Sequence, residues 1–176
     1  MHILKILYYS LFQSYIMLGI TLWGENTSKL FKIQKKFIRI ISNSSYNTHT
    51  EPLFKQLGIL KMVDLYHVSL LSFYYKFCHH KLPNFFTHFN LSRISIHNIH
   101  YDMRPRNVFP TPYCRTRQAE HRIRYRLPHL LNSTPECILN KVYTHSCKGF
   151  TNYIKIFYLH EYSDICEIRN CYICGL

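Results

Sequence analysis

Apolar and basic residues alternate with a helical period between residues 27 and 41. A helix would follow Thr27, whose hydroxyl is a candidate N-terminal cap, and its apolar side consists of Leu30, Phe37, Ile38 and Ile41. The opposite side carries a run of cations: Lys29, Lys32, Lys35, Lys36 and Arg39. The pattern predicts an amphipathic helix with one apolar face and one strongly basic face.

Two further helices are expected after a polar break at residues 43–47. Thr50 is a second candidate cap, and Gly58 is placed to end the short helix that follows it. A longer helix, from about Met62 to His79, carries apolar residues on more than one side and should be largely buried. Pro83 marks its end, because the residue before a proline disfavours helical geometry.

The hydrophobic periodicity fades over residues 92–118, and its loss predicts a long ordered loop there. Arg122, Arg124 and Arg126 then alternate with Ile123 and Tyr125, a pattern typical of a half-buried strand with guanidinium groups on its exposed face. Short helical segments are expected at 85–89, 136–143 and 150–160, the last of them entered through Ser146 as a cap.

The resulting fold class is mainly α. A helical bundle is expected over residues 1–82, and a loop-rich basic segment with short extended pieces over 83–135. Two C-terminal helices over 136–160 and a cysteine-containing tail over 161–176 complete the chain.

Residues Ile6 to Trp23 form an uncharged stretch of 18 residues, long enough to be considered as a membrane span. Ser10, Gln13 and Ser14 within it, together with three tyrosines, oppose insertion into a bilayer. We therefore expect a buried core helix here, with a membrane anchor as the alternative.

Several short motifs follow one another in a recognisable order. They are Trp23-Gly24, Ile33-Gln34-Lys35-Lys36, Arg39-Ile40-Ile41, His49-Thr50-Glu51-Pro52-Leu53-Phe54, Leu57-Gly58-Ile59-Leu60, Leu82-Pro83, Tyr101 with Arg104, Arg115-Thr116, Ile123-Arg124-Tyr125-Arg126-Leu127-Pro128 and Asn132-Ser133-Thr134-Pro135. This order resembles the region behind the polymerase palm in reverse transcriptases of non-LTR retrotransposons, the jockey-like elements, over roughly residues 8–160. The chain departs from the family at Leu127, Leu131 and Thr134, where Gly, Trp and Leu are usual.

The resemblance implies a thumb-like helical region that lies along template and primer. It also implies a palm with paired aspartates upstream, supplied in cis or in trans, and RNA-directed DNA polymerase activity for the whole enzyme. Such polymerases hold two metal ions with paired carboxylates, whereas this chain has nine scattered acidic residues and no Asp-Asp pair. We expect no enzymatic activity, no catalytic metal and no cofactor.

The formal net charge of +13 and the pI near 9.5 favour polyanionic partners, RNA or DNA before membranes. Seven of the ten arginines lie between Arg104 and Arg126, interleaved with aromatic residues, which suits phosphate contact and stacking on unpaired bases. The candidate nucleic-acid-binding residues are Lys32, Lys36, Arg39, Arg115, Arg117, Arg122, Arg124 and Arg126.

The seven cysteines are more typical of reduced thiols in a cytoplasmic or nuclear protein than of a disulfide framework. Cys166, Cys171 and Cys174, with His160, could supply four zinc ligands. Their order and spacing do not match a usual zinc knuckle, so buried thiols are the preferred interpretation.

The function hypothesis is a polymerase fragment without its catalytic palm that binds nucleic acid weakly and without sequence preference. Two alternatives stay open: a small membrane-anchored protein with a span near Ile6–Trp23, and a transposon relic without a function.

Overall fold

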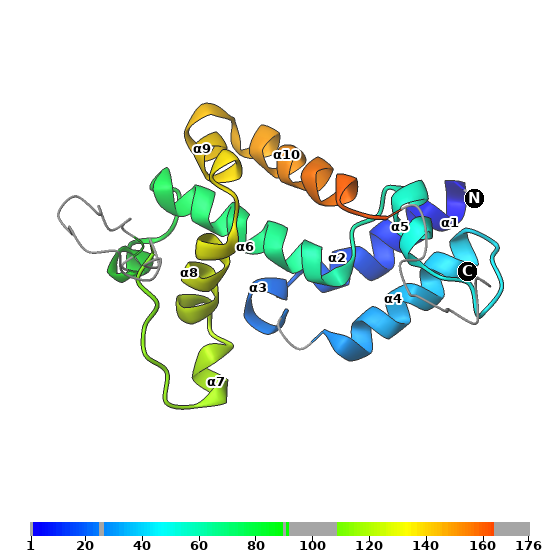
Figure 1. Cartoon of the computed structure of the whole chain (residues 1–176), viewed down its shortest axis with the longest axis horizontal. Helices are drawn as coiled ribbons and strands as arrows, with labels where there is room; N and C mark the ends of the chain where they lie inside the picture. Colours follow the sequence, from blue (N-terminus) through cyan, green and yellow to red (C-terminus); the bar gives the residue numbers. More distant parts are fainter. Residues whose placement is uncertain (1, 25–26, 90, 92–108, 164–176) are drawn as a thin grey trace, which may run out of the picture. The chain divides into compact units, whose positions relative to one another are not determined.

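The computed structural model describes residues 2–24, 27–89, 91 and 109–163, and this part of the chain is mainly helical (Figure 1). It contains no strand among those residues, so the predicted mainly α class is confirmed. The chain divides into two compact units, residues 1–68 with 151–176 and residues 69–150. Helices α6 (Met62–Cys78) and α10 (Cys147–His160) each contribute residues to both units.

The first unit begins with three helical segments that follow one another without a break. These are α1 (His2–Leu7), the π-helical η1 (Tyr8–Gln13) and α2 (Ser14–Met17). Gly19, with φ of −157° and ψ of 18°, interrupts the helix before α3 (Ile20–Trp23). No helix in the described part of the chain is both long and apolar enough to span a bilayer.

The stretch from Ile6 to Trp23 is not a buried core helix, and that expectation was wrong. Within it Tyr8, Ile16 and Ile20 are buried. Other large apolar side chains are exposed: Leu11 by 67%, Tyr15 by 82%, Leu18 by 85% and Leu22 by 75%. Because this stretch is apolar on every side, packing one side against the core leaves the remaining sides in solvent.

Helices α4 (Ser28–Ile41) and α5 (Glu51–Leu57) begin and end where the sequence predicts. The predicted hydroxyl caps were wrong, because the side chains of Thr27 and Thr50 make no capping hydrogen bond. Both threonines have φ near −90° (−94° and −90°) with ψ near zero, rather than the extended backbone of an N-cap. The predicted stop at Gly58 is confirmed, with φ of 63° in the left-handed region.

Gln34 is the polar centre of the first unit and is fully buried on α4. Its Nε2 donates to the Tyr8 hydroxyl at 2.8 Å and to the Leu60 carbonyl at 2.9 Å. Its Oε1 accepts from the Met62 backbone N–H at 3.0 Å. The Gln34 side chain thus joins η1, α4 and the start of α6. Burial raises the pKa of its partner Tyr8 to about 12.

The second unit contains the 3₁₀ turn η2 (Asn84–His88), α7 (Arg117–Glu120), α8 (Ile123–Ser133) and α9 (Glu136–Thr144), with the adjoining parts of α6 and α10. The predicted helical segments at 85–89, 136–143 and 150–160 are confirmed within one to three residues at their ends. Its buried side chains include Leu70, Leu71, Tyr74, Tyr75, Phe109, Leu127, Leu131, Ile138, Val142 and Phe150.

The entry to α10 is capped as predicted. The Ser146 hydroxyl accepts from the Gly149 backbone N–H at 3.2 Å. Nearby, the Tyr75 hydroxyl donates to the His145 carbonyl at 2.9 Å, and its ring stacks on Phe150 with centroids 5.4 Å apart. These contacts fix the turn between α9 and α10 against α6 within the second unit.

The predicted arginine-bearing strand is wrong, because residues 123–133 form helix α8. Ile123, Leu127 and Leu131 repeat every four residues, and the last two are fully buried. This helical period extends over more residues than the five-residue alternation that suggested a strand. Pro128 stands inside α8, and its missing N–H leaves the helix one backbone hydrogen bond short.

Two other expectations lie outside the described residues. They concern residues 92–108 of the predicted loop and the tail cysteines Cys166, Cys171 and Cys174.

Candidate nucleic-acid interface

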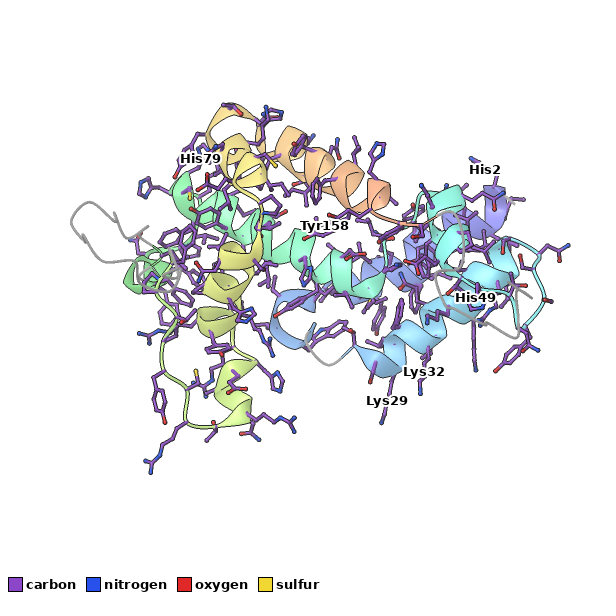
Figure 2. The ribbon with its side chains drawn as sticks, in the orientation of Figure 1. His2, Lys29, Lys32, His49, His79 and Tyr158 are labelled. Atoms are coloured by element: carbon purple, nitrogen blue, oxygen red, sulfur yellow. The ribbon has the colours of Figure 1, made fainter. Side chains whose placement is uncertain are left out.

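The basic face predicted for α4 is present in the first unit. Lys29, Lys32 and Lys36 are exposed and lie on one side of the helix, given 3.6 residues per turn. Figure 2 shows Lys29 and Lys32 pointing away from the ribbon. Within the described part of the chain these three ammonium groups make no hydrogen bond or ion pair. They are therefore available to an anionic partner.

Lys35 and Arg39 of α4 have structural roles. The Lys35 ammonium lies 4.5 Å from the centroid of the Phe31 ring. Nε of Arg39 donates to the Thr48 carbonyl at 2.9 Å, and its guanidinium lies 5.7 Å from the Tyr46 ring. Arg39 thus holds the loop after α4, although its terminal nitrogens can still meet an anion.

Three of the predicted arginines are exposed around α7 in the second unit: Arg115, Arg117 and Arg122. We call them the α7 arginines. The Thr116 hydroxyl caps the helix between them, because it accepts from the Ala119 N–H at 3.3 Å. Arg122 follows at the extended N-cap position of α8.

The chain that leads to the α7 arginines is tied to α8 at one residue. The Asn132 side chain accepts from the Phe109 N–H at 2.9 Å and donates to the Phe109 carbonyl at 3.0 Å. Phe109 itself is buried, with its ring edge-on to Tyr74 at 5.8 Å. This anchor positions the start of residues 109–116, which carry Arg115 at their far end.

Arg124 and Arg126, the last two predicted arginines, do not lie on the same side of α8. Arg124 and Arg126 belong to α8 and are two residues apart, so their side chains point about 200° apart around the helix, whereas Arg122 lies at the extended N-cap before the first turn. Arg126 is partly buried, with its guanidinium 6.0 Å from the Tyr125 ring. Arg124 is exposed and borders a hollow of about 180 Å³, lined also by Phe89, Leu91, Pro110, Thr111, Pro112 and Pro128.

The predicted site residues therefore form two sets, one in each unit. Lys32, Lys36 and Arg39 belong to α4 in the first unit, and the five arginines belong to the second. Lys29 extends the first set, and the periodicity of α4 already identified it as part of the basic face.

The described residues contain no group of three or more His, Cys, Asp or Glu side chains that could hold a metal ion. The partly buried carboxyl of Asp64 instead accepts from the Tyr162 hydroxyl, which in turn accepts from the Lys61 N–H at 2.8 Å. Burial raises the pKa of Asp64, and the hydrogen bond from Tyr162 opposes that shift. Lys61 also pairs with Glu51. This cluster connects the start of α6 to the residues after α10.

Comparisons with protein-family models, with curated proteins and with solved structures find no match to this chain.

Proposed function

We propose that the chain is a nucleic-acid-binding module that contacts the phosphate backbone with little regard for sequence. The observation that carries the proposal is the set of exposed cations at two helices: the α7 arginines in one unit and Lys29, Lys32 and Lys36 of α4 in the other. The three α7 arginines fall within the eight residues 115–122, which contain one acidic residue, Glu120.

Exposed lysine and arginine side chains bind polyanions by releasing the counterions condensed on the phosphates. Guanidinium groups add planar, two-pronged hydrogen bonding to phosphate oxygens. Tyr113 is 92% exposed two residues before Arg115 and offers a ring on which an unpaired base can stack. These features suit a single strand or an RNA–DNA hybrid better than a duplex read in its grooves.

The resemblance to the post-palm region of non-LTR reverse transcriptases supports the same proposal, since that region is expected to lie along template and primer. Under this proposal the chain catalyses nothing alone, works in the cytoplasm or nucleus, and acts with a palm supplied in cis or in trans.

The test is a fluorescence-anisotropy titration with labelled single-stranded RNA at one fixed salt concentration. The first variant combines Arg115→Gln, Arg117→Gln and Arg122→Gln. The matched control combines Lys76→Gln, Lys81→Gln and Lys148→Gln, three exposed cations of the same unit that are outside the candidate interface.

We expect the arginine variant to lose about tenfold in affinity, because three exposed charge contacts of roughly 0.5 kcal/mol each sum to one factor of ten. The loss should be alike for oligonucleotides of different sequence. Equal losses in the arginine variant and the lysine control would show that net charge alone drives binding, and would contradict an interface at α7.

A further inference from the structure

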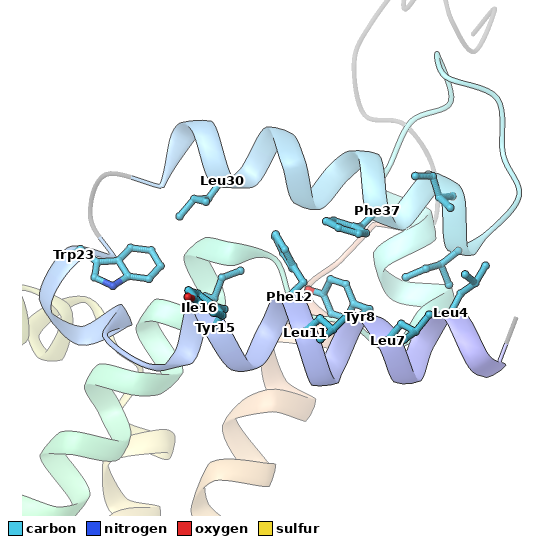
Figure 3. A pocket seen from close by; sticks show the side chains of 12 residues that line it. Leu4, Leu7, Tyr8, Leu11, Phe12, Tyr15, Ile16, Trp23, Leu30 and Phe37 are labelled. Atoms are coloured by element: carbon cyan, nitrogen blue, oxygen red, sulfur yellow. The ribbon is translucent and has the colours of Figure 1, made fainter.

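An apolar groove runs along the first unit between the N-terminal helices and α4 (Figure 3). The groove has a volume of about 560 Å³. Its floor includes the buried residues Tyr8, Ile16 and Ile41. The rings of Phe12 and Phe37 also line the groove, with their centroids 4.8 Å apart. Its walls are apolar as well: Leu4, Leu7, Leu11 and Tyr15 on one side, and Leu30, Phe37 and Ile40 on the other.

A basic hollow adjoins the groove at the end of α4. It has a volume of about 450 Å³ and shares Ile40 with the groove. Its remaining lining is polar and cationic: Lys36, Arg39, Asn43, Ser44 and Tyr46. The apolar groove and the basic hollow therefore meet at Ile40, and the described residues that line the hollow carry two positive charges and no acidic group.

The end of α4 does not offset these cations. The carbonyls of Ile38, Arg39 and Ile40 would carry the negative end of the helix dipole. Each accepts a backbone N–H, from Ser42 at 3.0 Å, Ser44 at 3.0 Å and Asn43 at 3.2 Å respectively. The full charges of Lys36 and Arg39 therefore dominate the hollow.

We propose that the groove and the hollow together bind one single-chain anionic amphiphile, a long acyl chain that ends in a carboxylate. The acyl chain lies in the groove between Leu11 and Phe37, and the carboxylate lies in the hollow near Lys36 and Arg39. The groove volume is within the range of about 300–1,000 Å³ typical of small-molecule sites.

The concave shape favours this ligand over a bilayer. The floor residues Tyr8 and Ile16 lie below the exposed walls formed by Leu11 and Ile40. A flat membrane would touch the walls and leave the floor uncovered, whereas a single chain can fill the space between the two helices. The cationic hollow at Ile40 further matches a ligand with one charged head.

Trp23, the chain's single tryptophan, lines the groove and so reports its occupancy. The experiment titrates the full chain with monomeric oleate and with neutral oleamide while Trp23 emission is recorded. We expect oleate to bind in a 1:1 ratio with a shift in that emission, and to bind more tightly than oleamide.

Two pairs of variants locate the site. Ile40→Asp places a charge in the wall, and Leu18→Asp places one on an 85% exposed residue outside it. Lys36→Gln removes a cation from the hollow, and Lys32→Gln removes one from α4 outside it. Circular dichroism confirms that each variant is folded.

Ile40→Asp should weaken oleate binding by about tenfold or more, and Leu18→Asp should not weaken it. Lys36→Gln should weaken oleate binding about fivefold and leave oleamide binding unchanged, while Lys32→Gln affects neither.

Four results would overturn the proposal. They are the absence of a Trp23 shift with oleate, equal losses in each pair of variants, an equal Trp23 shift with anionic phospholipid vesicles, and a shift with an acidic amphipathic peptide but not with oleate. The last would assign the groove to a protein partner. Lys36 belongs to both proposed sites, so the two proposals are separated at the α7 arginines: losing them should weaken nucleic-acid binding and leave oleate binding unchanged.

Discussion

At the scale of single residues, Gln34 contributes more to the first unit than its sequence position suggests. Its partners Tyr8, Leu60 and Met62 are each 26 or 28 residues away in the chain. Local periodicity places Gln34 on the apolar face of α4, four residues from both Leu30 and Ile38, but it cannot predict which groups the buried amide meets. The amide satisfies both of its N–H donors and one acceptor.

Gln34→Leu should lower the free energy of unfolding by about 2–4 kcal/mol, because it leaves the buried Leu60 carbonyl and Met62 N–H without a partner. Chemical denaturation followed by circular dichroism measures the loss. Lys32→Leu is the control on the same helix, and we expect it to change stability by less than about 0.5 kcal/mol. Similar losses in both variants would show that the amide network adds nothing.

Asp64 gives stability a dependence on pH. Its pKa is raised above the ordinary value of 3.8, chiefly by burial, so the folded state binds a proton more tightly than the unfolded state. The Asp64 contribution to stability is therefore largest below pH 3.8 and falls as the pH rises through the folded-state pKa.

Asp64→Asn removes this titration and keeps an acceptor for the Tyr162 hydroxyl. The stability of the variant relative to wild type should therefore increase between pH 3 and pH 7, as measured by urea denaturation at each pH. A difference that stays constant across that range would show that the burial of Asp64 has no effect on its ionisation.

At the scale of secondary-structure elements, α8 shows how a short pattern can mislead. Arginines at every second position suggest a strand with all three guanidinium groups on one face, whereas α8 points Arg124 and Arg126 about 200° apart. Arg124 instead borders the hollow lined by Phe89, Leu91 and Pro110, so a partner that binds at α7 is not expected to need it.

Single substitutions should therefore have unequal effects. Arg122→Gln is expected to weaken single-stranded RNA binding about twofold to threefold, and Arg124→Gln should leave it within error. Anisotropy titrations of the two variants against wild type provide the measurement. Equal losses of RNA affinity in the two variants would instead match a strand that presents both guanidinium groups on one face.

Most helices could be predicted because strong local signals mark their ends. Gly58 in the left-handed region ends α5, Pro83 follows the turn after α6, and the Ser146 hydroxyl caps α10. The exposed side of the Ile6–Trp23 stretch could not be predicted, because hydropathy does not say which side packs against the core. The basic hollow likewise depends on the loop after α4, which Arg39 and Thr48 hold in place.

At the scale of the whole molecule, the charge of +13 gives any polyanion a general attraction to this chain. The proposed function is more specific, because it assigns direct phosphate contacts to named residues. Direct contacts release counterions and make affinity fall steeply with salt, whereas a distant charge contributes only a screened attraction.

The most direct test of nucleic-acid binding is the slope of log affinity against log salt for a single-stranded RNA. The account predicts a steep slope for the wild type, flattened by about 2 in the Arg115→Gln, Arg117→Gln, Arg122→Gln variant, since each lost contact removes about 0.7. The matched Lys76→Gln, Lys81→Gln, Lys148→Gln variant should keep the wild-type slope. Equal slopes for all three proteins would contradict direct phosphate contact, because the α7 arginines would then be solvated cations that touch no phosphate.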